Sequence, residues 1–227
     1  MKSIGRKKIE EWFSSKEIKP FPFQYETWDA CLSGEQGLLN APTGSGKSFA
    51  LWFPSLIEWI NEYPHEYTEK SKNGLRLIWI TPLRALAKDL EIAFRETLQD
   101  LNIPWEVGRR TGDVAYSKKQ QQNKRMPEVL IITPESLHVL FTQKNYERHF
   151  THLKRIVVDE WHELLGTKRG TQTELALNRL KHISPGLNIW GVSATIGNLD
   201  EAMQVLLGDD VDASTSTIIR AEVEKNI

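Results

Sequence analysis

The amino-acid sequence predicts an α/β domain in which a mainly parallel sheet is sandwiched between helices. Three observations support this prediction. Short segments rich in Ile and Val recur along the chain, longer amphipathic segments separate them, and several short segments are apolar throughout. A strand that is apolar on both faces is typical of a parallel sheet covered by helices on both sides. The 227 residues, 40% of them hydrophobic, are enough for one such core.

The short segments are predicted to be strands because they are rich in β-branched residues and too short for helices. Three longer segments place apolar residues at spacings of three and four, so each has one face suited to pack on the sheet. A polar segment at 63–74 is predicted to be a surface loop, and 117–125 a solvated helix or a loop. The predicted strands are 38–39, 75–80, 105–107, 129–132, 155–158 and 188–192, and the helical segments are 49–60, 83–101 and 177–183.

Composition excludes several classes of protein. The longest apolar runs fall well short of the roughly 20 residues that span a bilayer, so no membrane partner is expected. Cys31 is the only cysteine, which predicts a reduced, cytoplasmic protein with Cys31 in the core. The net charge of -1 gives no support for nucleic-acid binding, so any such surface must be local. Basic residues cluster at 2–8, predicted to be a solvated face, and again at 109–125.

A glycine-rich loop, APTGSGKS, occupies residues 41–48 between a predicted strand and a predicted helix. It matches the phosphate-binding pattern G-x-x-x-x-G-K-[ST] except for Ala41 at the first position. The exception is tolerable because backbone N–H groups at a helix N-terminus hold the phosphate. Lys47 is predicted to reach the β- and γ-phosphates of ATP, and Ser48 to bind Mg²⁺. The predicted nucleotide-binding residues of this loop are Thr43, Gly44, Ser45, Gly46, Lys47 and Ser48.

An acidic pair follows the apolar segment 156–158. Asp159 lies at the carboxyl end of this predicted strand, where α/β sheets bind ligands, and is predicted to bind Mg²⁺ through water. Glu160 is predicted to accept a proton from the water that attacks the γ-phosphate. An aspartate that only caps a helix is the alternative. The glycine-rich loop upstream favours a site that uses ATP and Mg²⁺.

Residues 159–162, Asp-Glu-Trp-His, form a DExH box. At this point the chain resembles the superfamily 2 helicases, and within them the bacterial ligase-associated DExH-box helicases of the Lhr (large helicase-related) group. The resemblance extends from about residue 12 to 206 and implies the first of two RecA-type domains. It further implies that Gln24, in the segment Pro-Phe-Pro-Phe-Gln, reads the adenine edge, and that His162 couples the nucleotide state to the rest of the motor. Trp161 is predicted to be a core residue.

Four further motifs occur in the order that this family shows. Thr81-Pro82 begins a segment similar to motif Ia, and residues 111–113 and 133–136 resemble the other motifs that contact a single strand. Each is weak alone, since Thr-Pro is a frequent strand-to-helix junction. Hydroxyl and amide groups there suit phosphate contacts that read no sequence. The resemblance implies nucleic-acid contacts by Thr81, Pro82, Arg84, Thr111, Gly112, Thr133 and Pro134, and coupling by Ser193 and Thr195 of motif III.

We expect residues 1–208 to form the RecA-type domain and 209–227 to be a linker toward a second RecA-type domain that this chain lacks. In this family the second domain supplies arginine fingers, which contribute roughly 10³–10⁵ in rate. The chain by itself is therefore expected to be nearly inactive as an ATPase.

The function that the resemblance favours is an ATP-dependent DNA helicase or translocase acting on single-stranded nucleic acid. A repair role beside a ligase and a nuclease is implied by the resemblance alone. An RNA-directed helicase, a P-loop ATPase switch that ignores nucleic acid, and a non-catalytic nucleic-acid-binding module remain alternatives. The ordered Thr-Pro motifs argue against the switch, and intact Lys47, Asp159 and Glu160 argue against the non-catalytic module.

Overall fold

The computed structural model describes residues 2–194, 196–208 and 213–221. Within these residues seven strands form one sheet, in the order β3-β4-β2-β5-β6-β1-β7, and every recorded pair is parallel. This confirms the predicted α/β class. The strands are β1 (Gln36–Asn40), β2 (Leu77–Ile80), β3 (Val107–Arg110), β4 (Val129–Ile132), β5 (Arg155–Val158), β6 (Asn188–Ser193) and β7 (Ser216–Arg220).

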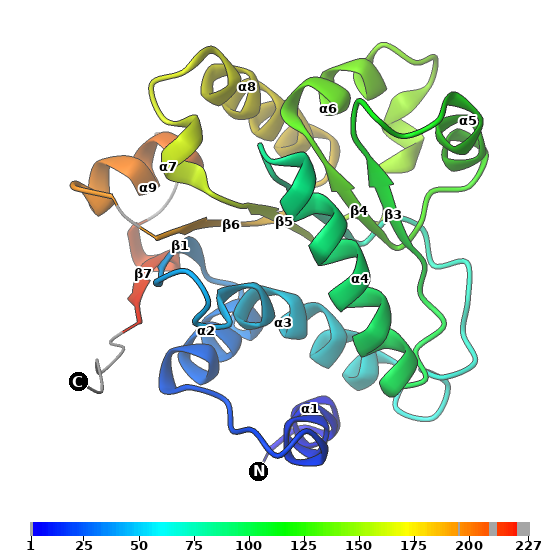
Figure 1. Cartoon of the computed structure of the whole chain (residues 1–227), viewed down its shortest axis with the longest axis vertical. Helices are drawn as coiled ribbons and strands as arrows, with labels where there is room; N and C mark the ends of the chain where they lie inside the picture. The colour runs from blue at the N-terminus through cyan, green and yellow to red at the C-terminus, as the bar shows by residue number, and fades with distance from the viewer. Residues whose placement is uncertain (1, 195, 209–212, 222–227) are drawn as a thin grey trace.

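Helices cover both faces of the sheet (Figure 1). One face is covered by α1 (Ile4–Ser15), α2 (Pro22–Leu32), α3 (Lys47–Glu62) and α4 (Arg84–Asp100). The other is covered by α6 (Pro134–Phe141), α7 (Trp161–Leu164), α8 (Lys168–Ile183) and α9 (Leu199–Leu207). Helix α5 (Tyr116–Lys124) lies beside the edge strand β3, and two short 3₁₀ turns are η1 (Tyr146–His149) and η2 (Ala213–Thr215). No helix in the described ranges has the length and apolar character needed to cross a membrane.

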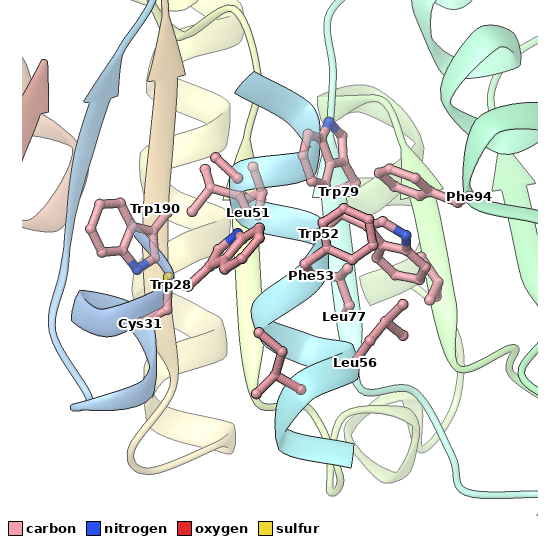
Figure 2. Packing of buried hydrophobic residues seen from close by; sticks show 14 of the residues in the cluster. Trp28, Cys31, Leu51, Trp52, Phe53, Leu56, Leu77, Trp79, Phe94 and Trp190 are labelled. Carbon is pink, nitrogen blue, oxygen red and sulfur yellow. The ribbon is translucent and has the colours of Figure 1, made fainter. Parts of the chain in front are cut away.

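Alternate residues of the central strands enter two separate cores. Leu77 and Trp79 of β2 pack with α3 and α4, whereas Ile78 and Ile80 face the opposite helical layer. Figure 2 shows α3 lying over β2, with Trp52 stacked on Phe94 of α4 at a ring-centroid distance of 4.3 Å. Two-sided burial explains why these strands are apolar throughout.

The sequence missed helices α1, α2, α6 and α9 and placed some strand ends wrongly. Strand β2 begins at Leu77 rather than residue 75, and β3 runs over Val107–Arg110 rather than 105–107. Helix α2 was hard to predict because it buries polar residues, Gln24 and Thr27, along with its apolar ones. Residues 117–125, predicted to be a solvated helix or a loop, form α5 up to residue 124.

The sheet also continues beyond residue 208. Residues 216–220, within the expected linker 209–227, form β7 and pair with β1 along its whole length. Their Ser/Thr-rich composition suggested a linker, but β-branched Thr217, Ile218 and Ile219 suit a half-buried strand. Residues 209–212 and 222–227 of that expected linker lie outside the described residues.

A buried ion pair joins helix α3 to strand β5 of the sheet. Arg155, at the start of β5, lies 2.8 Å from the Glu58 carboxylate of α3. Its guanidinium also donates to Ser55 Oγ and to Asn188 Oδ1, both at 3.0 Å. The arginine therefore joins α3, β5 and β6 through one side chain.

Replacing Arg155 with Met is expected to lower the free energy of unfolding by about 3 kcal/mol, because the change leaves a partly buried carboxylate without its partner. Urea unfolding of the chain measures the effect. Lys8→Met is the matched control, since it breaks the exposed Lys8–Glu11 pair and should cost less than about 1 kcal/mol. Equal losses in the two variants would contradict the structural role of Arg155.

Candidate functional site

Six of the predicted motifs lie at the carboxyl ends of six different strands, which meet at one edge of the sheet, whereas the Gln24 segment lies in α2. Strand order then sorts the motifs into two groups. The adjacent strands β3, β4 and β2 lead to Thr111, Thr133 and Thr81, and the adjacent strands β5, β6 and β1 lead to Asp159, Ser193 and the loop 41–48. The predicted nucleic-acid motifs (the nucleic-acid half) and the predicted nucleotide motifs (the nucleotide half) therefore lie side by side, although in the sequence the former all fall between the loop 41–48 and the DExH box.

The loop 41–48 connects β1 to α3. Gly44 and Gly46 adopt φ of 79° and 81°, a left-handed conformation that side chains other than glycine rarely take. A Cβ at Gly46 would also lie 2.9 Å from Gln24 Nε2. Lys47 and Ser48 are the first two residues of α3, so they lie at a helix N-terminus, where backbone N–H groups attract anions.

A short ion pair joins this loop to the DExH box. Lys47 Nζ lies 2.9 Å from Glu160 Oε1, and the two side chains are only 9% and 14% exposed. Glu160 itself has φ of 49°. Such a left-handed conformation is uncommon for a residue other than glycine, and strain of this kind often marks a functional position. The contact brings the predicted phosphate-binding lysine and the predicted proton acceptor together.

Asp159 is buried, at 1% exposure, beside this pair. Its Oδ2 accepts a hydrogen bond from Trp79 Nε1 at 3.1 Å, and its Oδ1 accepts one from the Glu160 N–H at 2.9 Å. Both donors are neutral. Lys47 forms its ion pair with the Glu160 carboxylate and not with Asp159. Burial raises the pKa of Asp159 to about 6.

A buried carboxylate beside a phosphate-binding loop, with no cation bonded to it, fits a divalent metal ion. In the described part of the chain, no cluster of three His, Cys, Asp or Glu side chains could hold a metal by itself. Mg²⁺ is commonly held by one or two carboxylates together with phosphate oxygens and water. The residues present therefore fit Mg²⁺ delivered with a nucleotide.

The raised pKa of Asp159 predicts a pH-dependent stability. Its pKa is higher in the folded chain than the ordinary 3.8, so the folded state binds the proton more tightly than the unfolded state does. The contribution to stability is then full well below the unfolded pKa of 3.8 and is lost as pH rises through about 6, a total change of about 3 kcal/mol. Urea unfolding of wild type and Asp159→Asn measures it, because the variant lacks this titration. A constant difference between the two proteins from pH 4 to pH 7 would contradict the prediction.

His162 connects the DExH box to the end of β6. Its Nδ1 lies 3.1 Å from Ser193 Oγ and 3.5 Å from Glu160 Oε2. The structure thus brings together two residues predicted to couple the sites, while the third, Thr195, lies outside the described residues. Trp161 is fully buried and donates to the Ala202 carbonyl at 2.8 Å, so its assignment to the core is confirmed.

Gln24 ties the N-terminal segment to the phosphate-binding loop. It is 2% exposed, its Oε1 accepts from the Phe21 N–H, and its Nε2 donates to the Gly46 carbonyl, both at 2.9 Å. The side chain therefore contacts the loop itself. Recognition of the adenine edge by Gln24 stays a prediction.

The nucleic-acid half contains a surface depression of about 450 Å³. Three of the predicted motifs meet there, each contributing the residues just after its strand. Thr81 and Thr111 are fully buried behind it. The depression is lined by Pro82, Arg84, Gly112, Thr133, Glu135, Ser136 and Arg169.

The hydroxyl groups of the two buried threonines stabilise their own loops. Thr81 Oγ1 accepts from the Leu83 N–H at 3.3 Å, and Thr111 Oγ1 accepts from Arg109 Nη1 at 3.0 Å. The sequence suggested that these hydroxyls contact phosphate, but the loops direct them inward. Pro134, also buried, begins α6. Contacts by these residues with nucleic acid stay predictions.

Sequence reasoning left Arg169 out of the candidate site. It lies in α8, far along the chain from the other lining residues, yet its Nη2 donates to the Pro82 carbonyl at 3.0 Å. Its Nε forms an ion pair with Glu135 Oε1 at 2.5 Å. The only available signal was its place in the segment after the DExH box, which gave no indication of what it faces.

The chain is similar in sequence to several proteins of known family. A family model described as DEAD/DEAH box helicase matches residues 21–202. The Lhr helicase/probable uracil glycosylase of Mycolicibacterium smegmatis is 32% identical over 210 residues, 87% of this chain and 14% of that protein. The ATP-dependent helicase Lhr-Core of Methanocaldococcus jannaschii is 32% identical over 219 residues, 92% of this chain and 25% of that protein.

Solved structures of helicases are also similar to this chain. The Mycobacterium smegmatis helicase Lhr bound to ssDNA and AMP-PNP superposes with a TM-score of 0.79 at 30% identity, over 93% of this chain and 27% of that one. Mss116p bound to ssRNA and AMP-PNP gives 0.78 at 21% identity and shares the fold, over 94% of this chain and 42% of that one. The chain thus has the RecA-like helicase fold and spans a quarter or less of the length of these two Lhr relatives.

Proposed function

Because this chain belongs to the DEAD/DEAH box helicase family and is a helicase ATP-binding domain homologous to Lhr proteins, we propose that it drives a motor that moves along single-stranded DNA. One observation carries the proposal. The strand order brings the nucleotide half next to a surface depression, and the Lys47–Glu160 ion pair connects two motifs of the nucleotide half. The depression is lined by the three motifs that we predict to contact single-stranded nucleic acid. DNA is favoured because the Lhr structure at 30% identity is bound to ssDNA.

In the nucleotide half, ATP would bind with its phosphates on the backbone N–H groups of residues 44–48. Lys47 would leave Glu160 for the β- and γ-phosphates, because two phosphate charges outweigh one carboxylate. Ser48 and Asp159 would hold Mg²⁺, which when bound neutralises charge on the phosphate oxygens. Glu160, released from Lys47, would orient the attacking water and accept its proton.

We propose that His162 reports this change. It lies next to both Glu160 and Ser193, so movement of the glutamate alters the contact between the DExH box and the end of β6. We propose that His162, Ser193 and Thr195 pass the nucleotide state to the rest of the motor. A second RecA-type domain carrying arginine fingers would complete the ATPase site. A repair ligase or nuclease is the further partner we propose.

The decisive experiment is the ATPase activity of the complete protein with single-stranded DNA, duplex DNA and RNA. We expect single-stranded DNA to stimulate turnover most. Activity that ignores all three nucleic acids would favour the ATPase switch, and stimulation by RNA alone would favour an RNA-directed helicase. Failure to bind ATP with Mg²⁺ would favour the non-catalytic module.

The ion pair between Glu135 and Arg169 predicts a gain of affinity. Glu135→Gln in the complete protein removes a negative charge from the proposed strand path and releases Arg169 for phosphate. We expect single-stranded DNA to bind about 3- to 10-fold more tightly, with a steeper salt dependence because one more cation is available. Fluorescence anisotropy at several salt concentrations measures both. Glu147→Gln, a neutralised glutamate in η1 outside the lining of the depression, is the control, and equal affinities in the two variants would contradict the prediction.

A further inference from the structure

The indole of Trp79 reaches the carboxylate that we assign to Mg²⁺ binding. Trp79 Nε1 donates to Asp159 Oδ2 at 3.1 Å, and both residues are buried. The other oxygen, Oδ1, accepts from the Glu160 N–H. With one donor on each oxygen, the plane of the carboxylate is fixed. A carboxylate offers about four lone-pair sites, so two remain for a cation or its water.

The indole that makes this contact is itself held rigidly. Trp79 lies in β2, where it is paired with Val157, two residues before Asp159. Its ring packs edge-to-face on Phe94 at 5.1 Å, and Phe94 is stacked on Trp52, as Figure 2 shows. The backbone is also anchored, because the Asp159 N–H donates to the Ile80 carbonyl at 2.8 Å. The position of the indole N–H group is therefore fixed, and the Asp159 carboxylate is oriented toward it.

The need to satisfy a buried N–H group does not account for this contact. The indole N–H groups of Trp28, Trp52 and Trp105 are buried with no hydrogen-bond partner in the structure. Those of Trp161 and Trp190 donate to backbone carbonyls. This core thus leaves several indoles unpaired, whereas Trp79 donates to a charged side chain.

We propose that Trp79 is a positioning residue that holds the Asp159 carboxylate in the orientation needed to receive the cation of a bound nucleotide. The indole N–H suits this role because it is a neutral donor with no acceptor. Lysine or arginine in its place would neutralise the carboxylate and compete with the metal. The proposal rests on the proposed function, since it presupposes that nucleotide and Mg²⁺ bind here.

Trp79→Phe in the complete protein tests the proposal, because it removes the N–H donor and keeps an aromatic ring. Trp190→Phe is a matched control: Trp190 is also fully buried, and its N–H donates at the same distance, 3.1 Å, but to the Glu35 carbonyl. Equilibrium titration with a fluorescent AMP-PNP analogue, at graded Mg²⁺ and in EDTA, separates cation binding from nucleotide binding. Loss of a residue that orients a metal ligand typically costs 10- to 100-fold in metal affinity.

We expect Trp79→Phe to raise the Mg²⁺ concentration for half-maximal nucleotide binding about tenfold, with affinity in EDTA unchanged. Trp190→Phe should leave both values at wild type. A Mg²⁺ requirement in Trp79→Phe within about twofold of wild type, or an equal shift in both variants, would overturn the proposal. Failure of the nucleotide site itself looks different, because wild type would then show no Mg²⁺-dependent nucleotide binding, and the stimulation of wild-type ATPase by single-stranded DNA tests the rest of the proposed function separately.

A second variant keeps the test open if Trp79→Phe does not fold. Phe94→Leu retains the indole N–H but removes the ring against which the indole packs. A smaller rise in the Mg²⁺ requirement is expected. An unchanged requirement in folded Phe94→Leu, with Trp79→Phe unfolded, would overturn the proposal.

Discussion

Replacing Glu160 with Gln is expected to lower the nucleic-acid-stimulated ATPase rate of the complete protein by about 10³-fold, within the range of a lost general base. Glutamine keeps the size of the side chain but cannot accept the proton of the attacking water. Nucleotide affinity should not fall, because the change also releases Lys47 from its 2.9 Å ion pair and leaves it free for phosphate. Steady-state turnover with saturating single-stranded DNA measures the first effect, and titration with AMP-PNP measures the second.

Two further variants show whether the effect is specific. Glu163→Gln neutralises an exposed glutamate three residues on, 3.5 Å from His162, and should keep turnover near wild type. Lys47→Ala should differ from Glu160→Gln, because its loss should appear in nucleotide affinity as well as in rate. Wild-type turnover in Glu160→Gln or in Lys47→Ala would refute the roles assigned to these residues.

The chain of residues 1–227 by itself is expected to hydrolyse ATP about 10³- to 10⁵-fold more slowly than the complete protein, because arginine fingers from a second RecA-type domain contribute that factor. The structure gives a physical reason to expect binding without turnover. The phosphate-binding loop, Lys47 and Glu160 are already assembled in this chain, whereas the arginine fingers would come from the second domain.

The two proteins should be compared at saturating ATP, Mg²⁺ and single-stranded DNA, with AMP-PNP binding measured in parallel. Measurable binding with negligible turnover is the expected result for the short chain. Comparable turnover would mean that the domain completes its own active site, and the proposal of a missing partner domain would be wrong.

Sequence reasoning succeeded where a function depends on backbone and local order. The loop 41–48 and Asp159 could be located because a strand, a loop and a helix follow one another within a few residues. The apolar strands could be found because burial on both sides removes polar residues from them. These features are local, so a single sequence contains them.

Sequence reasoning failed where a contact joins residues that are far apart in the sequence. Nothing in the sequence indicates that Arg169 faces Glu135 or that Trp79 reaches Asp159, because such contacts depend on strand order and side-chain direction. Strand β7 was missed because its neighbour is β1, at the other end of the chain, and its Ser/Thr content is typical of a linker. Burial of the Thr81 and Thr111 hydroxyls likewise depends on the conformation of each loop.

The position of β1 between β6 and β7 has a consequence for how the chain folds. Asn40 and Ser193 lie opposite each other although 153 residues separate them. By contrast, β2, β3 and β4 all lie within residues 77–132. Closing a long loop costs more entropy than closing a short one, and non-local pairing slows folding. On the ribosome, the strand that leads into the phosphate-binding loop emerges early but gains its sheet neighbours only when β6 and β7 emerge. The phosphate-binding loop is therefore synthesised before the predicted strand-contacting motifs and is among the last sites to be completed.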